Sequence, residues 1–486
     1  MELITDYEKL VIYEKDYNRI PVMGEIYADI TTPILLLLRL AEVDRNFFLL
    51  ESVEGGEHFG RYSFLGYQPL LRISCKSNQV HITQNSKEIR IDKSPMEALR
   101  DLLQENIAPR LHYLPTFSGG LVGYFSYEMI KYAEPKLSIK ESEFNDYDFM
   151  LFDKVIAFDH LKQKIIIIVN YSAKEGVTGY NKALADLHKI EALIRENAPI
   201  SALPAGEIIN FSCNMSKEEY SALVEITKKY IKEGDIFQAV VSRRFEANMK
   251  GSLLNAYRVL RTTNPSPYMY FIQNNDLQIT GASPETMVKL SDGLLTTFPV
   301  AGTRPRGKTE EEDNQFETEL MADEKELSEH NMLVDLARND IGKISAFGSV
   351  KVKEYMKIHR FSKVMHIASV VTGVIDKAKD GCDTIGAVLP AGTLSGAPKF
   401  RACEIIDELE PVARGVYGGA IGYLDLSGNL DVCIAIRTAV KKNDRVYVQA
   451  GAGIVADSVP EKEYEECSNK ASAVIEAIKR ASEVKI

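Results

Sequence analysis

The chain has 486 residues, of which 45% are hydrophobic, and a formal charge of −11. This length is ample for a large core and more than one lobe. The acidic balance, without any lysine/arginine cluster, disfavours nucleic acid as a partner. The longest purely apolar runs, Ile34–Leu38 and Ile165–Val169, are far too short to span a membrane.

Six cysteines are spread along the chain without a close-spaced framework, which is typical of free thiols in a reducing compartment. The acidic N-terminus resembles neither a signal peptide nor a transit peptide. We therefore expect a soluble, cytoplasmic protein with no membrane partner.

The first 200 residues show mainly strand and turn patterns. The β-branched runs Val155–Phe158 and Ile165–Val169 predict a hairpin, and Phe47–Ser52 and Leu70–Ser74 predict further strands. The sequence SGGLVG at 118–123 predicts a tight turn. The segment APISALPAG at 198–206 is rich in small residues and proline, and it is the best candidate for a linker.

Beyond this linker, Ser216 and Glu219 have the spacing of a capping box, which predicts a helix that ends at Gly234. Ile236–Arg243 then predicts a strand. Later strands are often joined by short glycine turns, as in Val416–Leu426, which favours antiparallel pairing. We expect an α+β fold: large antiparallel or mixed sheets in a sandwich-like core, flanked by helices, in two interleaved lobes.

Two Glu-x-x-Glu pairs, Glu326/Glu329 and Glu463/Glu466, lie where carboxylates are unusual. At 100° per residue, each pair falls inside the apolar arc of a predicted helix. A buried carboxylate is costly unless it is paired or bound to a metal, so the four together indicate a site. If they converge, an all-oxygen ligand set suits Mg²⁺ rather than zinc.

A simpler reading of these glutamates is helix capping. Asp323 followed by Glu326 fits a capping box, and Glu463 follows Pro460, which is typical of a helix entry. Acidic residues in a first turn also suit the helix dipole.

Other residues are compatible with binding an anion. The sequence GTLSGAPK at 392–399 could present backbone N–H groups and a lysine, although an ordinary turn explains it equally well. Gly451–Gly453 would permit close approach of a ligand or form a plain bulge. Arg437, in an apolar strand, is either an internal ion-pair partner or an anion clamp. A lone histidine such as His366 is more often structural than catalytic. Together, the four glutamates and these candidate anion-binding residues indicate a Mg²⁺-dependent enzyme whose substrate carries carboxylates or phosphates.

Several segments strongly resemble the chorismate-utilising enzymes. They are PVAGTRPRG (299–307), DEKELSEHNMLVDLARND (323–340), GTLSGAPK (392–399), YGGAIGY (417–423), IRTA (436–439) and QAGAGIVADSVPEKEYEECSNKA (449–471). LLESVEGGEHFGRYSFLG (49–66) and NPSPYMYFI (264–272) resemble anthranilate synthase component I in particular. The resemblance covers nearly the whole chain. It implies a tryptophan-binding regulatory region at 1–200 and a chorismate-binding catalytic region at 215–486.

Two positions separate the reactions within this family. Water-adding relatives, which make isochorismate or salicylate, carry a basic lysine where this chain has Gln238, and glutamine cannot act as that base. Aminodeoxychorismate synthases typically carry a nucleophilic lysine where this chain has Ala301. The resemblance thus implies an anthranilate synthase. An aminodeoxychorismate synthase component I without the usual lysine, or a non-catalytic tryptophan-sensing subunit, is an alternative.

The resemblance implies that chorismate and ammonia give anthranilate and pyruvate. Mg²⁺ would be held by Glu329 and Glu466, Glu326 would protonate the departing C4 hydroxyl, and Glu463 would orient water or accept a proton. His366 would assist the elimination of pyruvate. The residues expected to hold substrate are Gly302, Thr303, Tyr417, Arg437, Gly451, Ala452 and Gly453, with Lys470 at the ring end; Thr303 and Lys470 are also expected to take part in catalysis.

The resemblance also implies regulation and a partner. The residues expected to line a tryptophan feedback site are Glu51, Ser52, Pro267, Tyr268 and Met269. No cysteine-centred nucleophile elbow of a glutaminase is visible, so we expect a separate glutamine amidotransferase subunit (component II) and a heterotetramer with two copies of each subunit.

Overall fold

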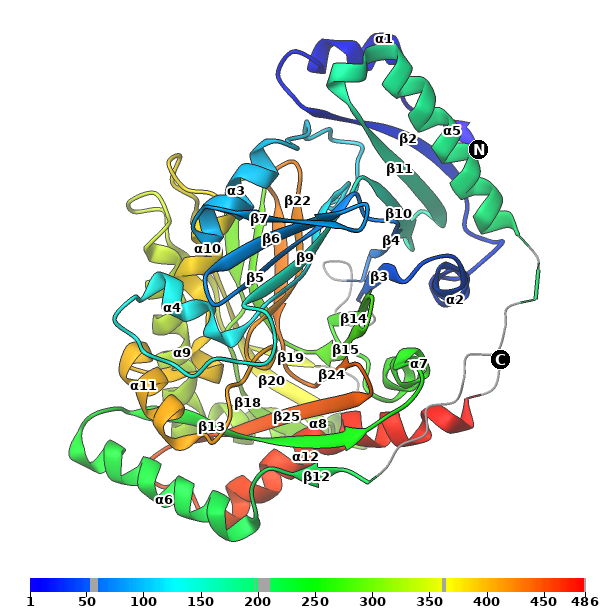
Figure 1. Ribbon diagram of the computed structural model, residues 1–486. Coiled ribbons are helices and arrows are strands. Elements are labelled where there is room, and N and C mark those ends of the chain that lie inside the picture. The colour runs from blue at the N-terminus through cyan, green and yellow to red at the C-terminus, as the bar shows by residue number, and fades with distance from the viewer. Residues whose placement is uncertain (53–59, 197, 200–209, 361–363, 485–486) are drawn as a thin grey trace.

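The computed structural model describes residues 1–52, 60–196, 198–199, 210–360 and 364–484, which form two large sheets with helices around them (Figure 1). Most of the expected linker, residues 200–206, and residues 53–59 of the N-terminal motif lie outside the described residues. Neighbouring strands run antiparallel in both sheets, so the expected α+β class is confirmed.

Within the described residues, the first sheet has 13 strands. In spatial order they are β1 (Glu2–Leu3), β2 (Arg19–Tyr27), β11 (Lys164–Ser172), β10 (Lys154–Asp159), β4 (Tyr62–Tyr67), β3 (Asn46–Glu51), β14 (Tyr268–Asn274), β15 (Leu277–Ser283), β24 (Thr438–Lys442), β25 (Arg445–Ile454), β13 (Gln238–Asn248) and β12 (Ser212–Cys213), with β21 (Gly396–Ala397) on β13.

The second sheet has 12 strands in the part of the chain that the structure describes. In spatial order they are β18 (Val300–Pro305), β20 (Val364–Val374), β17 (Leu294–Thr297), β16 (Thr286–Ser291), β23 (Leu430–Ile434), β22 (Ala420–Asp425), β8 (Gly120–Phe125), β9 (Tyr147–Phe152), β5 (Leu71–Lys76), β6 (Gln79–Gln84) and β7 (Lys87–Ile91), with β19 (Lys351–Arg360) on β20.

Helices flank these sheets. They are α1 (Tyr7–Leu10), α2 (Pro33–Val43), α3 (Pro95–Gln104), α4 (Ile130–Ala133), α5 (Gly176–Arg195), α6 (Lys217–Glu233), α7 (Leu254–Thr263), α8 (Glu310–Met321), α9 (Glu324–Gly342), α10 (Gly381–Val388), α11 (Lys399–Leu409) and α12 (Pro460–Arg480). Among the helices of the described residues, none combines the length and the apolar character needed to cross a membrane.

Both sheets combine strands from the two halves of the chain. In the first sheet β3 pairs with β14, and in the second β8 pairs with β22. The sheets face one another through aromatic side chains, with ring centroids 4.8 Å apart for Phe48 and Phe152 and 6.2 Å apart for Phe64 and Tyr423. This arrangement agrees with the expected sandwich-like core and interleaved lobes. The assignment of residues 1–200 to regulation and 215–486 to catalysis stays a prediction.

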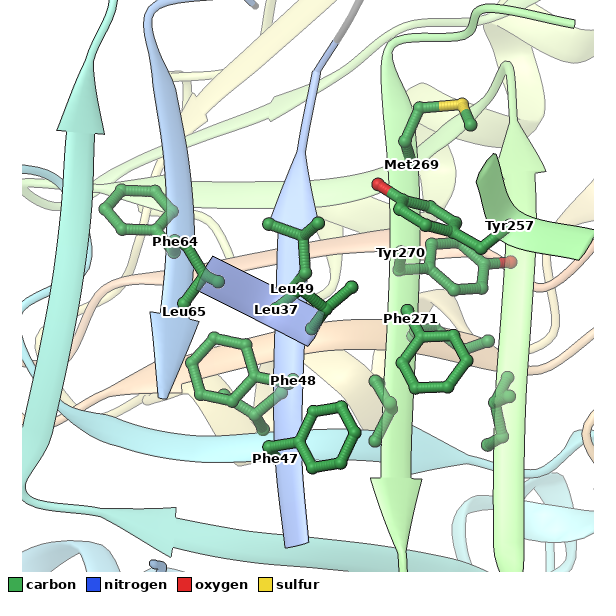
Figure 2. Packing of buried hydrophobic residues seen from close by; sticks show 14 of the residues in the cluster. Leu37, Phe47, Phe48, Leu49, Phe64, Leu65, Tyr257, Met269, Tyr270 and Phe271 are labelled. Carbon is green, nitrogen blue, oxygen red and sulfur yellow. The ribbon is translucent and has the colours of Figure 1, made fainter. Parts of the chain in front are cut away.

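The outer face of the first sheet is covered at its centre by α2 and α7. Figure 2 shows Leu37 of α2 and Tyr257 of α7 among the side chains of β3 and β14. Phe47 and Phe271 stack there with centroids 5.8 Å apart. Full burial of one such apolar side chain contributes about 1.5–3 kcal/mol, so this patch joins the two halves firmly.

Several local predictions can be compared directly with the structure. The Ser216/Glu219 capping box is present in both directions, and the helix ends at Gly234 with φ +86°. The hairpin of β10 and β11 is confirmed. The predicted turn at 118–123 is wrong, because β8 begins at Gly120. A Cβ there would lie 2.1 Å from the carbonyl oxygen of Leu424, so this glycine permits close strand contact rather than a turn.

Candidate active site

The chain passes from one sheet to the other at two adjacent places. Glu285 lies between β15 and β16, and Arg437 lies between β23 and β24. Because β15 pairs with β24 and β16 pairs with β23, the two crossings are neighbours. Arg437 therefore lies in a bend with φ +49°, rather than in the strand expected from its apolar neighbours. The structure brings a carboxylate and a guanidinium together between the sheets.

Glu285 is a half-buried residue that the sequence interpretation missed. Its Oε1 accepts a hydrogen bond from the Thr393 hydroxyl at 2.8 Å. Burial raises its pKa to about 7, although that hydrogen bond and the charges of Lys470 and Arg437 act in the opposite direction. Burial lowers the pKa of Arg437, and Glu285 opposes this change. The available signal in the sequence was a carboxylate two residues after the strand-like segment Leu277–Ser283.

Thr303 and His366 face one another across β18 and β20. The register between β18 and β20 shifts beside Gly302, which forms a bulge. Its φ of +63° is a conformation that a residue with a side chain rarely adopts. Nδ1 of His366 lies 3.0 Å from Thr303 Oγ1 and 3.0 Å from the Gly302 carbonyl oxygen. Burial lowers the pKa of His366, and the charge of Arg437 adds to this effect. The structure therefore places Gly302, Thr303 and His366 together, and their roles stay predictions.

Glu326 lies beside the same bulge. Asp323 caps α9 by accepting from the backbone N–H groups of Lys325 and Glu326, so the capping interpretation holds for Asp323. The Glu326 carboxylate instead lies 3.7 Å from Nη1 of Arg304, and its Oε2 is 3.3 Å from the position of a Cβ on Gly302. Glu326 thus faces Gly302 at the edge of the site.

The two Glu-x-x-Glu pairs influence one another between α9 and α12. Burial raises the pKa of Glu329, and the charges of Glu326 and Glu466 raise it further. Burial also raises the pKa of Glu463, with a further contribution from Glu466 and an opposing hydrogen bond from Ser458. The first two turns of both helices therefore concentrate negative charge, as a cation site requires.

Glu466 and Lys470 correct one expectation. They form an ion pair of 2.7 Å, but their side chains are 50% and 44% exposed, so they are not buried in an apolar arc. The apolar arc of α12 is buried only from Cys467 onward, so the first turns of this helix lie outside the core. Across the described residues, no three His, Cys, Asp or Glu side chains are gathered closely enough to hold a metal ion. The carboxylate oxygens of Glu329 and Glu466 are ligands of the kind that Mg²⁺ prefers. In this structure, however, no three of the four glutamates in the two pairs lie close enough together to coordinate one ion.

The strand β25 forms another wall of the site. Lys470 Nζ donates to the Gly451 carbonyl oxygen at 3.1 Å. A Cβ on Gly451 would lie 2.9 Å from the Tyr417 hydroxyl, and one on Gly453 would lie 2.6 Å from the Gln238 amide nitrogen. The glycines thus let Tyr417 and Gln238 lie against this strand. Ala452, between them, is fully buried.

The loop at 392–399 does not present its lysine to an anion. Lys399 donates to Asp340 at 2.8 Å and to the Val388 carbonyl oxygen at 3.2 Å. Lys399, the cation that was expected to bind an anion, is therefore already bound by Asp340 and the Val388 carbonyl oxygen, and the anion-binding hypothesis for this loop is not supported. Its contribution is the hydroxyl of Thr393, which holds Glu285.

The residues expected to bind tryptophan lie near one another but on two faces of the first sheet. Glu51 is directly opposite Met269 in the β3–β14 register, so these side chains share a face. Tyr268 points the other way, where its hydroxyl donates to Asp431 at 2.8 Å. Ser52 is half-buried, and Pro267 is buried.

A family model described as chorismate binding enzyme matches residues 45–476. Curated relatives named anthranilate synthase component 1 match over nearly their full length. The one from Acetivibrio thermocellus is 46% identical over 98% of this chain and 99% of its own. The one from Pseudomonas aeruginosa is 45% identical over 96% of this chain and 97% of its own. The chain belongs to the anthranilate synthase component I family of chorismate-binding enzymes.

Solved structures agree with this membership. Anthranilate synthase component I from Streptococcus pneumoniae has a TM-score of 0.78 and 38% identity, over 92% of this chain and 98% of its own. MenF, the isochorismate synthase of Escherichia coli, has a TM-score of 0.69 at 18% identity over 97% of this chain and 98% of its own, which shows the same fold. As a member of this family, the chain is a chorismate-utilising enzyme, and the site between the sheets is its candidate active site.

Proposed function

We propose that this chain is the large subunit of an anthranilate synthase, which catalyses the first committed step of tryptophan biosynthesis. Chorismate and ammonia would give anthranilate, pyruvate and water. The names of the near-full-length relatives support this activity.

The choice of ammonia over water as the nucleophile rests on the environment of the Gln238 side chain. It is 4% exposed, and its Oε1 has no hydrogen-bond partner among the described residues. An amide cannot remove a proton from water, but its carbonyl oxygen can accept an N–H from ammonia. Ala301 offers no amine for a covalent route, which argues against the lysine-dependent synthases.

The residues of the site have complementary tasks in this proposal. Arg437, Tyr417, Thr303 and the Gly451–Gly453 backbone would hold the enolpyruvyl carboxylate, and Lys470 the ring end. A protonated carboxyl group would assist departure of the C4 hydroxyl as water, giving an aminodeoxyisochorismate intermediate. Glu326 is the expected donor, and Glu285, with its pKa of about 7, is a second candidate.

Elimination of pyruvate from that intermediate requires a base, and His366 would fill this role. Glu463 would orient water or accept a proton from the incoming ammonium. Glu329 and Glu466 would hold Mg²⁺, which when bound neutralises the ring carboxylate of chorismate.

Ammonia would come from a separate glutamine amidotransferase subunit, in a heterotetramer with two copies of each subunit. Tryptophan would act as a feedback inhibitor near Ser52 and Tyr268. The relatives' designation as component 1 supports a second component.

The experiment is to mix the purified chain with chorismate, Mg²⁺ and an ammonium salt at alkaline pH, and to follow anthranilate fluorescence and pyruvate. Equal amounts of both products, lost on chelation, would support the proposal. Consumption of chorismate without pyruvate would indicate an aminodeoxychorismate synthase. No consumption would favour a non-catalytic, tryptophan-sensing subunit.

A further inference from the structure

A cavity of about 720 Å³ lies on the outer face of the first sheet, away from the chorismate site. It is bordered by the N-terminal end of α2, the β10–β11 turn, α7 and the C-terminal end of α12, which lie on one side of the molecule (Figure 1). Arg480 on its rim is 14 residues beyond Glu466 along α12, which is about 21 Å. The volume is within the range of small-molecule sites.

Three arginines and one carboxylate, Asp159, line this cavity, and Asp159 is paired with Arg61 at 2.8 Å. Arg258 and Arg261 are three residues apart on α7 and so share a face, and Arg480 approaches from α12. Arg258 donates to the Asn255 side chain at 3.2 Å and has no ion pair in the described part of the chain. Arg480 is 54% exposed and 3.8 Å from Glu483. Among the described residues, Arg258 therefore leaves one unpaired positive charge on the wall of the cavity.

The wall of the cavity is fixed from behind by a buried carboxylate. The Glu51 side chain is 1% exposed, and it accepts from Arg261 at 2.6 Å and from the hydroxyl of Ser63 at 3.3 Å. Ser63 Oγ in turn lies 2.7 Å from Nε2 of His160, which lines the cavity. A hydrogen-bonded network of this kind holds Arg261 and His160 in place in the absence of a ligand.

Two further features of the cavity point to a ligand. The hydroxyl oxygen of Thr31 is buried and has no partner among the described residues, and a buried polar atom normally has one. The remaining wall includes Ile34, Phe158 and Val259, which would contact an apolar group. We propose that this cavity binds a small organic anion with an apolar body, at a site separate from the chorismate site.

The test uses the full chain and the dye 8-anilino-1-naphthalenesulfonate, which joins a sulfonate to aromatic rings and fluoresces when its rings leave water. We expect one saturable site in the native protein. Arg258→Ala and Arg480→Ala should each weaken binding by about tenfold, because each removes one charge-assisted contact. Lys479→Ala is the matched control, since this exposed lysine is adjacent on α12 but does not line the cavity.

Retention of native affinity in Lys479→Ala, with loss in the two arginine variants, would support the site. Absence of saturable binding, or equal binding by all variants, would overturn it. Displacement of the dye by excess chorismate would also overturn it, because the dye would then lie in the active site. The measurement needs no catalytic activity, so it can fail independently of the proposed function.

Discussion

The carbonyl oxygen of Gly302 lies 3.0 Å from Nδ1 of His366. A carbonyl oxygen can only accept, so this hydrogen bond requires the proton on Nδ1 and leaves the lone pair on Nε2. Burial lowers the pKa of the imidazole, which keeps it neutral near pH 7. The bulge at Gly302 therefore selects the tautomer in which His366 can act as a base.

Replacement of His366 by asparagine should slow the second half of the reaction. We expect kcat to fall by about 10²–10⁴-fold with a small change in KM, because a positioned general base is lost. The aminodeoxyisochorismate intermediate should accumulate and be separable from anthranilate by chromatography. His359→Asn is the matched control, since His359 is paired with His366 across β19 and β20 but is exposed. Equal kcat in both variants would exclude His366 as the base.

Glu285 should impose an alkaline limb on the pH profile. Its pKa of about 7 lies above the ordinary value, so the carboxyl group holds its proton below pH 7 and loses it as the pH rises. If Glu285 donates a proton, kcat/KM at constant free ammonia should fall above pH 7, and Glu285→Gln should lack this limb. Glu461→Gln, an exposed control at the start of α12, should retain it.

The same raised pKa predicts a stability effect that does not depend on activity. The favourable contribution of the protonated carboxyl group is complete below its ordinary pKa and is lost as the pH rises through about 7. Glu285→Gln should therefore melt about 1–3 °C higher than the native protein at pH 8, and the difference should shrink towards pH 5. A melting difference independent of pH would contradict the raised pKa.

The elements with local signals were predictable from the sequence. The Ser216 capping box and the β10–β11 hairpin depend on neighbouring residues, and both occur as expected. The residues of the candidate active site were harder to predict, because their positions depend on how the strands of the two sheets are arranged. Glu285 becomes part of the site only because two sheet crossings are adjacent, and no helical or strand period reveals this. Glu466 was misplaced as buried because a helical wheel cannot show where a helix leaves the core.

Removal of a carboxylate from α9 should weaken Mg²⁺ binding. Glu329→Gln should raise the Mg²⁺ concentration for half-maximal activity, and the calorimetric Kd for Mg²⁺, by about 10–100-fold, because one charged oxygen ligand is lost. Glu324→Gln removes an exposed carboxylate from the same helix and should leave both values unchanged. Full Mg²⁺-dependent activity of Glu329→Gln would refute its assignment as a metal ligand.

The side chains of β3 and β14 alternate between the two faces of the first sheet, and this predicts which residues tryptophan can contact together. Ser52 follows Glu51 and so should point to the Tyr268 face, between the sheets. Ser52→Ala should raise the half-inhibitory tryptophan concentration by about tenfold, since one hydrogen bond to a charged ligand is lost, with kcat unchanged. Unaltered inhibition would remove Ser52 from the feedback site.

A single methyl group added at Gly451 should disturb the wall that β25 forms in the candidate active site. Its Cβ would lie 2.7 Å from the Val241 carbonyl oxygen of β13 and 2.9 Å from the Tyr417 hydroxyl, so β25 must move away from β13 and Tyr417 must also adjust. We expect Gly451→Ala to raise the KM for chorismate by at least about tenfold, because a displacement of about 1 Å misaligns bound substrate. Gly342→Ala, at the end of α9 where an added Cβ meets nothing within 4 Å, is the control for adding a methyl group. If Gly451→Ala kept the native KM, the close approach of substrate to this strand would be excluded.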